Sequence, residues 1–258
     1  MELELKGKKV LITGGSKGIG LACARAFIAE GARVAIVSRS QENLNQGKKS
    51  LGEAYAIAAD LTDAAAAARM VEKVESEFGS IDVLVNSAGA AKRTNADERT
   101  PEAWRAAMDA KYFTYINVID PLVKRMAARG SGVIINIIGS GGKIASPIHL
   151  AGGSANAALM LATAGLANAY AAKGVRVVGL NPGLTNTSRV SEGLKADAKR
   201  EGISEEEALA RARRKLPLGR LAEPGEIADI AVFAASARGR FLTGANISCD
   251  GVSTATVV

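Results

Sequence analysis

Short apolar runs rich in β-branched residues alternate with longer segments of helical periodicity along the whole chain. The apolar runs cover residues 10–13, 32–37, 55–59, 81–86, 132–138, 175–181 and 245–249, and the helical segments cover 18–29, 41–50, 64–78, 101–128, 151–172 and 225–235. This rhythm is typical of βαβ units, and the unbroken apolar runs indicate strands that are covered on both faces. The pattern predicts an α/β fold with one doubly wound, seven-stranded parallel sheet and helices on both faces.

One long segment, residues 184–221, departs from this alternation because it is rich in charged residues. Within it, three glutamates at 205–207 precede four cations between 211 and 215, an order that complements the dipole of a helix. A solvated helix fits this pattern better than a binding patch. We therefore expect a single domain over residues 1–258, with a charged helical lid at about 184–221.

Residues 144–172 carry no Asp, Glu, Lys or Arg and are long enough to span a bilayer. The segment nevertheless contains Pro147 and His149, and small residues dominate it. It is interpreted as a buried helix, apolar nearly all round, with a membrane span as the alternative. In the preceding helical segment, Pro121 lacks a backbone donor and is expected to kink the helix.

Composition narrows the classes of function. Of the 258 residues, 48% are hydrophobic and only 4% aromatic, which is typical of a globular domain and unlike a stacking surface for nucleic acid. The 33 Lys and Arg outnumber the 26 Asp and Glu but are spread along the chain, so a small anionic ligand fits better than a phosphate polymer. Cys23 and Cys249 are far apart and no signal peptide is apparent. These features predict a cytoplasmic protein with no metal site, no nucleic-acid partner and no membrane partner.

A glycine-rich turn, Thr-Gly-Gly-Ser-Lys-Gly-Ile-Gly at residues 13–20, joins the first apolar run to the first helical segment. Gly14 permits a tight turn, Gly18 lets a pyrophosphate approach the backbone, and Gly20 lets the helix pack closely on the strand. The N-terminus of the helix then faces the anion, as in a Rossmann-type fold. The residues predicted to bind a dinucleotide here are Gly14, Ser16, Lys17, Gly18, Ile19 and Gly20.

The end of the second apolar run indicates which dinucleotide is bound. An NAD site usually has a carboxylate there for the ribose 2′-hydroxyl, but this chain has Arg39 and no Asp or Glu. The guanidinium of Arg39 suits a 2′-phosphate, and Lys17 adds a second positive charge nearby. The alternative is that both are surface cations. We predict NADP(H) as the cofactor.

Further motifs follow in a fixed order along the chain. They are Asp60-Leu61, Asn86-Ser87-Ala88-Gly89, Asn136-Ile137, Pro182-Gly183 with Thr187, Pro217-Leu218-Gly219-Arg220, Thr243-Gly244 and Asp250-Gly251. With these motifs and the glycine turn, the chain resembles the short-chain dehydrogenase/reductase family over essentially its whole length. The resemblance implies that Asp60, beside Leu61, contacts the adenine, that residues 86–89 line the cofactor cleft with Asn86, Ala88 and Gly89, and that Thr187 meets the nicotinamide carboxamide. It also implies a homodimer or homotetramer that pairs the fourth and fifth helices.

The catalytic positions of the resembled family differ in this chain. The family uses an Asn, a Ser, a Tyr as general acid/base and a Lys that lowers the pKa of the Tyr. Alignment through the neighbouring motifs gives Lys111, Gly139, Gly152 and Asn156 at these positions. Tyr170 comes too late to replace the Tyr, and Tyr112 and Tyr115 lie before the fifth apolar run. The alignment therefore predicts a divergent member without the usual tetrad.

Lys111 stands at the Asn position and Asn156 at the Lys position, so the two residue types have changed places. This exchange suggests a maintained polar site, in which a buried Lys111 donates a hydrogen bond or titrates near neutrality and Asn156 orients it. An idle, solvated lysine is the alternative. His149 and Ser140 are two further candidates, since a histidine can act as acid or base and Ser140 follows the position of the missing Ser.

These observations predict an NADP(H)-dependent oxidoreductase that acts on a carbonyl or alcohol substrate through a rebuilt active site. Two other functions remain open, namely a non-catalytic NADP(H)-binding protein and a lyase or isomerase that uses the same cleft. Lys92, Arg93 and Arg189 follow motifs at the expected substrate entrance. They favour an anionic or strongly polar small-molecule substrate, with ordinary surface charge as the alternative.

Overall fold

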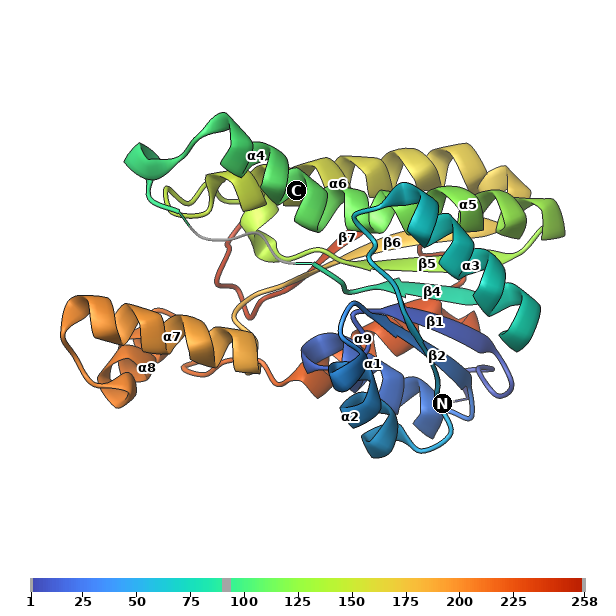
Figure 1. The fold of residues 1–258 in the computed structure, drawn as a ribbon, viewed down its shortest axis with the longest axis horizontal. Helices are drawn as coiled ribbons and strands as arrows, with labels where there is room; N and C mark the ends of the chain where they lie inside the picture. Colours follow the sequence, from blue (N-terminus) through green and yellow to red (C-terminus); the bar gives the residue numbers. More distant parts are fainter. Residues whose placement is uncertain (1, 90–93, 257–258) are drawn as a thin grey trace.

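Seven parallel strands form one sheet in the computed structural model, which describes residues 2–89 and 94–256 (Figure 1). The strands are β1 (Lys9–Thr13), β2 (Arg33–Ser38), β3 (Tyr55–Ala58), β4 (Val83–Asn86), β5 (Gly132–Ile137), β6 (Val175–Pro182) and β7 (Asn246–Cys249). Their order in the sheet is β3-β2-β1-β4-β5-β6-β7. The strand order reverses between β1 and β4, which in such sheets is where a ligand crevice opens at the carboxyl ends. The predicted fold is confirmed.

Helices cover both faces of this sheet (Figure 1). The α-helices are α1 (Gly18–Ala29), α2 (Gln41–Leu51), α3 (Ala64–Phe78), α4 (Pro101–Ala107), α5 (Thr114–Arg129), α6 (Leu150–Tyr170), α7 (Ser188–Glu201), α8 (Glu205–Arg214) and α9 (Pro224–Ala235). Helices α3, α5 and α6 lie on one face, and α1, α2 and α9 lie on the other (Figure 1).

The central strands bury side chains on both sides, as their unbroken apolar runs predict. Leu11, Leu84 and Ile134 pack in the cluster beneath α3, α5 and α6. Their chain neighbours Ile12 and Ile135 pack in the opposite cluster, beneath α1 and α9. Since successive side chains of a strand point to opposite faces, this division means that neither face is left to solvent.

The predicted helix over 101–128 is interrupted, so this prediction was wrong in part. After α4 the chain forms a π-helical turn, η2 (Met108–Phe113), before α5 begins at Thr114. Pro121 lies inside α5, which continues past it to Arg129, so the helical pattern changes ahead of the proline. A π-helical turn leaves little signal in hydrophobic periodicity, and such turns occur frequently at functional sites.

Helix α6, interpreted from the sequence as a buried helix that is apolar nearly all round, is buried on one face in the single chain. Ala155, Leu159, Thr163 and Ala167, three or four residues apart, face the interior, whereas Leu161 is 76% exposed. In the described part of the chain, Leu150–Lys173 is the one helix with the length and hydropathy of a membrane span. Its buried face packs into the core beside the sheet, as expected of a core helix.

The charged segment folds as α7 and α8, which project from the body of the domain (Figure 1). Its two ends meet in a narrow neck, where Thr185 forms a parallel bridge with Ala222. The amide of Ala222 donates to the carbonyl of Leu184 at 3.0 Å, and the amide of Asn186 donates to the carbonyl of Ala222 at 2.8 Å. The charged segment thus leaves and re-enters the domain at one place.

Candidate active site

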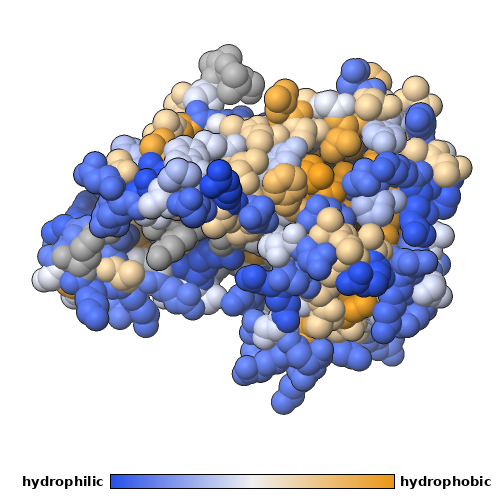
Figure 2. All heavy atoms as spheres, turned by 45° about the horizontal axis from the view of Figure 1, so that its top comes forward, coloured by the Kyte–Doolittle hydropathy of each residue, from blue (hydrophilic) through white to orange (hydrophobic). Residues whose placement is uncertain are grey.

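A cleft of about 610 Å³ lies at the carboxyl ends of the central strands. A notch separates the projecting α7–α8 segment from the body of the domain in the space-filling view (Figure 2). Its walls come from the glycine turn, the end of β2, the loop after β4, the π-helical turn, the end of β5 and the start of α7. Among its lining residues are Gly14, Ser16, Lys17, Gly18, Ile19, Arg39, Leu61, Ala88, Gly89, Lys111, Gly139, Thr187 and Arg189.

The glycine turn has the conformation that its sequence predicts. Gly14 has φ +65° and Gly18 has φ +57°, a left-handed region that favours glycine. A Cβ on Gly14 would approach the carbonyl oxygen of Ser87 to 2.8 Å, and a Cβ on Gly20 would collide with the carbonyl of Gly14. Gly18 lines the cleft, and a Cβ there would make only ordinary contact with Thr187, at 3.5 Å. The backbone at the start of α1 is therefore free to receive a ligand.

Basic and hydroxyl side chains gather where β2 ends. Ser38, Arg39 and Ser40 line the cleft, together with Asn43 in the first turn of α2. Arg39 is exposed and carries the positive charge on this wall. No carboxylate from β2 or the first turn of α2 is among the described residues that line it.

Asp60 turns its carboxylate toward its own loop. It accepts hydrogen bonds from the amide of Thr62 at 3.0 Å and from its hydroxyl at 2.8 Å. These bonds lower the pKa of the Asp60 carboxyl, with a smaller contribution from the charge of Arg39. Its neighbours Ala59, Leu61 and Thr62 line the cleft, whereas Asp60 does not in the described structure.

Asn86 does not line the cleft in the described structure but holds the loop that does. It is fully buried, and its Nδ2 donates to Oδ1 of Asn136 at 3.0 Å, while Asn136 donates to Thr163 on α6 at 3.0 Å. The hydroxyl of Thr13 accepts from the amides of Ser87 and Ala88. This polar network joins β1, β4, β5 and α6, and it shapes the loop whose residues 87–89 line the cleft.

Lys111 places its amine at the cleft from the π-helical turn. Its Nζ donates to the hydroxyl of Tyr115 at 3.1 Å and to the backbone carbonyl of Ile137 at 3.2 Å. Burial lowers the pKa of this amine from 10.5 to about 7, and the positive charge of Arg189 adds to the shift. This amine is therefore easier to deprotonate than that of an exposed lysine.

The start of α7 forms the facing wall of the cleft. Thr187 caps the helix by accepting from the amide of Val190 at 3.4 Å. Arg189 donates to the carbonyl of Gly89 at 3.3 Å. Lys92 and Arg93, the two other cations predicted at this entrance, lie outside the described residues.

Residues 8–198 match the family model described as short chain dehydrogenase. The chain belongs to the short-chain dehydrogenase/reductase family. It is 30% identical to 3alpha-hydroxysteroid dehydrogenase of Mediterraneibacter gnavus, over 98% of this chain and 99% of that protein. It is 33% identical to NADP-dependent (R)-specific alcohol dehydrogenase of Lentilactobacillus kefiri, over 97% and 98%. The structure of L-sorbose reductase from Gluconobacter frateurii, complexed with NADPH and L-sorbose, matches 100% of both chains with a TM-score of 0.94 and 30% identity.

In this short-chain dehydrogenase, Asn156 lies buried behind the loop that follows β5. The side chain is 5% exposed, and its Oδ1 has no hydrogen-bond partner among the described residues. A Cβ on Gly139 or Gly141 would lie 3.4–3.5 Å from its Nδ2. Asn156 therefore adjoins the glycine-rich loop, and the structure gives the orienting contact to Lys111 from Tyr115 instead.

The other candidate residues of this short-chain dehydrogenase lie around the same loop. Gly139, with φ +116°, lines the cleft, and Gly152 is buried in the first turn of α6. Ser140 begins the short turn η3 (Ser140–Gly142), and His149 precedes α6. The ring of His149 packs beside Gly141, 3.2 Å from where a Cβ would lie. Neither Ser140 nor His149 is among the described lining residues of the cleft.

Several residues of this site were not predicted from the sequence, among them Tyr115 and Glu192. Tyr115 contacts Lys111, and Glu192 on α7 lines the cleft. The spacing of Lys111 and Tyr115 is a usable signal, since residues i and i+4 share one face of a helix. Glu192 lies in the charged segment, where the sequence alone gives no reason to single out one carboxylate.

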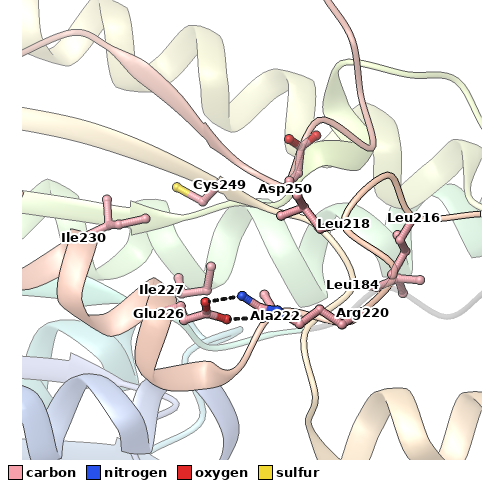
Figure 3. A pocket seen from close by; sticks show the side chains of 12 residues that line it. Leu184, Leu216, Leu218, Arg220, Ala222, Glu226, Ile227, Ile230, Cys249 and Asp250 are labelled. Carbon is pink, nitrogen blue, oxygen red and sulfur yellow. Dashed lines mark hydrogen bonds and ion pairs between the residues drawn. The ribbon is translucent and has the colours of Figure 1, made fainter. Parts of the chain in front are cut away.

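A second, smaller pocket of about 170 Å³ adjoins the cleft at Gly183 (Figure 3). Leucines 184, 216 and 218 line it from the charged segment, and Ile227 and Ile230 line it from α9. The Arg220 guanidinium donates to both carboxylate oxygens of Glu226 at 2.7 Å on one side of the pocket (Figure 3). The thiol of Cys249 also reaches this pocket, where burial raises its pKa to about 11. Cys23 and Cys249 are both unpaired.

Proposed function

We propose that this short-chain dehydrogenase is an NADP(H)-dependent oxidoreductase that interconverts a carbonyl and an alcohol through a rebuilt active site. In this proposal Lys111, Gly139, Gly152 and Asn156 occupy the four usual catalytic positions. The observation that carries the proposal is the amine of Lys111, held at the cleft with a pKa of about 7. An acid or base with a pKa near the working pH is well suited to proton transfer.

The residues of the cleft fit NADP(H). The glycine turn supports this assignment, because side chains at Gly14 or Gly20 would occupy space that backbone atoms need there. The pyrophosphate is assigned to residues 14–20 at the start of α1, and the 2′-phosphate to Arg39 and Lys17. NADPH, when bound, supplies the hydride that turns a carbonyl carbon into an alcohol carbon.

Other parts of the cofactor are assigned by family resemblance. The adenine is assigned to the loop of Asp60 and Leu61, and the carboxamide to Thr187. Of the residues at the end of β4, Ala88 and Gly89 line the cleft, while Asn86 holds their loop in place through its buried network. We therefore give Ala88 and Gly89 a direct role and Asn86 an indirect one.

Lys111 acts as the proton donor in the reduction. As the carbonyl carbon is reduced, its oxygen takes a proton from the ammonium of Lys111, which is left as a neutral amine. The amine then takes a proton from water. The reverse reaction uses the neutral amine as a base toward the alcohol. His149, which packs beside Gly141, and Ser140, at the start of η3, are held as secondary candidates.

An anionic or strongly polar substrate fits the facing wall, where Arg189 lines the cleft. The projecting segment at 184–221 is proposed to act as a lid over the substrate. Arg189 belongs to this segment, so a substrate anion would draw the start of α7 toward the cleft. A small acid such as a 2-oxo carboxylate provides a direct probe.

Self-association through α5 and α6 is a further part of the proposal. The solvent-facing side of α6 includes Leu161, and hydrophobic side chains gather on the face that α4, α5 and α6 present (Figure 2). A second copy of the chain would cover this face in a homodimer or homotetramer. Light scattering at micromolar concentration tests it, and a stable monomer contradicts it. The two unpaired cysteines support a reducing compartment such as the cytoplasm.

Turnover tests the function directly. Purified protein is mixed with NADPH and a panel of neutral and anionic carbonyl compounds, and absorbance at the nicotinamide band is followed. Oxidation of NADPH with formation of the alcohol is the expected result. Tight binding of NADPH without turnover on any substrate would favour the non-catalytic function. Product formation without a net absorbance change would favour a lyase or isomerase.

A further inference from the structure

Tyr115 lies one helical turn after Lys111 and makes two hydrogen bonds with its hydroxyl. It donates to the backbone carbonyl of Ile137 at 2.5 Å and accepts from Nζ of Lys111 at 3.1 Å. Lys111 also donates to the same carbonyl at 3.2 Å. The phenol, the amine and the carbonyl therefore form a closed triangle at the end of β5.

The carbonyl of Ile137 is available because of the strand register. The last pair between β4 and β5 is Asn86 with Asn136, and β5 runs one residue further. Ile137 therefore lies past the end of β4. Its carbonyl oxygen accepts hydrogen bonds from Lys111 of η2 and Tyr115 of α5 instead of from a partner on β4.

Tyr115 is fixed as an acceptor toward Lys111. Its side chain is fully buried, and burial raises the pKa of the phenol far above its ordinary value of 10. The phenol therefore keeps its proton and uses it to donate a hydrogen bond to the carbonyl oxygen of Ile137. Its lone pairs are left for the lysine amine, so Tyr115 itself does not serve as the acid.

The ring of Tyr115 also contacts the amine of Lys111. Its Nζ lies 4.8 Å from the centre of the Tyr115 ring, within the range of a cation–π contact. The amine enters this position from η2, whose π-helical geometry departs from that of α4 and α5. The described charged and titratable groups that act on the amine are Tyr115 in the following turn and Arg189 on α7.

We propose that Tyr115 is a positioning residue, whose hydroxyl, with the carbonyl of Ile137, holds the Lys111 amine at the wall of the cleft. An ammonium has three N–H donors, and these two acceptors occupy two of them. One donor is left for the oxygen of a substrate. The catalytic meaning of this arrangement rests on the proposed function, in which Lys111 is the proton donor.

The test compares Tyr115→Phe with Tyr112→Phe, which lies in the same region and makes neither hydrogen bond. Lysine labelled with ¹³C at Cε is incorporated, and its NMR signals are followed from pH 5 to 11 in the protein without cofactor. The signal of Lys111 is assigned by its loss in Lys111→Met. Removal of an acceptor disfavours the ammonium, so Tyr115→Phe is expected to lower the titration midpoint by about one pH unit. Tyr112→Phe is expected to leave it unchanged.

Turnover gives a second readout. Tyr115→Phe is expected to lower kcat about 10-fold with a change in KM of less than about 3-fold, because the misplaced amine affects proton transfer more than binding. For the reduction, which needs the protonated amine, the alkaline limb of the pH profile should move with the NMR midpoint. A loss of thermal stability with an unchanged midpoint and unchanged kcat would mean a purely structural role and would overturn the proposal.

Two further arrangements keep the test decisive. If Tyr115→Phe does not fold, the four tyrosines are replaced by 3-fluorotyrosine, whose oxygen is a weaker acceptor. The midpoint of Lys111 is then expected to fall, and an unchanged midpoint overturns the proposal. The NMR midpoint does not depend on turnover. If the wild type turns no substrate over, the proposed function fails while the contact between Tyr115 and Lys111 is still tested.

Discussion

Arg189 of α7 donates a hydrogen bond to the backbone carbonyl of Gly89 at 3.3 Å, from one wall of the cleft to the other. The contact joins the charged segment to the loop that follows β4. Arg189 also lowers the pKa of Lys111, because two positive charges disfavour each other. One arginine thus affects both the position of α7 and the charge of the buried amine.

Replacement of Arg189 by Met is expected to raise the pKa of Lys111 above about 7. The loss of a like charge favours the ammonium, so the midpoint moves up, by a fraction of a pH unit because Arg189 is exposed and screened by salt. NMR titration of the ¹³C-labelled lysine measures it. Arg213→Met, on the projecting α8, is the matched control. A midpoint that falls in Arg189→Met would contradict the electrostatic argument.

Lys111→Met is expected to lower kcat by about 100-fold or more, the usual scale for the loss of one general acid or oxyanion donor. NADPH affinity should change little, because the pyrophosphate and the 2′-phosphate are assigned to other residues, those of the glycine turn and Arg39. Steady-state kinetics and calorimetry check the two parts. Lys124→Met, which removes an exposed ion pair with Asp120 on α5, should leave kcat unchanged. An unchanged turnover number in Lys111→Met would contradict the role of Lys111 as proton donor, and His149 would then be the next residue to replace.

The same substitution should change how stability depends on pH. The pKa of Lys111 is about 7 in the folded protein and 10.5 as the ordinary value, so the unfolded chain binds more protons between these pH values. Burial of this amine destabilises the folded protein at pH 7, and this destabilisation becomes smaller as pH rises from about 7 to 10.5. Urea denaturation measures the free energy of unfolding at each pH. The value for Lys111→Met is expected to exceed that of the wild type most at pH 7 and least near pH 10. A constant difference across this range would show that Lys111 is not desolvated.

Arg39→Asp is expected to weaken NADP binding about 10- to 100-fold, the scale of one hydrogen bond between charged groups. A carboxylate repels the 2′-phosphate but accepts from the 2′-hydroxyl of NAD, so the preference should move toward NAD. Isothermal calorimetry with both cofactors measures the change. Arg25→Asp makes the same change of net charge on the exposed side of α1 and serves as the control. Unchanged NADP affinity in Arg39→Asp would remove Arg39 from the site.

Arg176→Met is expected to destabilise the protein by about 3 kcal/mol, because it leaves buried carbonyl groups without donors. The guanidinium of Arg176 on β6 donates to five backbone carbonyls at the end of α9 and the turn after it, those of Ala234, Ala235, Ser236, Gly239 and Leu242. Chemical denaturation gives the free energy of unfolding. Arg238→Leu, which loses a single bond to the carbonyl of Glu2, should cost far less.

The sequence predicts the strands well because their apolar runs are unbroken. The strands end within about two residues of their predicted limits, as at β4, predicted over 81–86 and found at Val83–Asn86. The glycine turn is equally predictable from the sequence, because the positive φ angles of Gly14 and Gly18 limit the residue types that fit. A restriction of this kind depends on the type of a single residue, so the sequence alone is enough to predict it.

Side-chain directions are harder to predict. The sequence indicates that Lys111 belongs to the site, but it assigns the orienting role to Asn156 rather than to Tyr115. The π-helical turn at η2 sets where the lysine points, and nothing in the hydrophobic pattern marks that turn. Asp60 is similar, because only the structure shows its carboxylate bonded to Thr62. These contacts depend on tertiary packing and not on the local sequence.

The neck between Thr185 and Ala222 makes the charged segment a closed excursion from the fold. Its two ends are joined by backbone hydrogen bonds, so the geometry of the sheet does not depend on the length of the chain between them. A longer or shorter excursion would add little loop-closure entropy, which grows only slowly with length. Changes of length within α7 and α8 are therefore expected to leave the sheet intact.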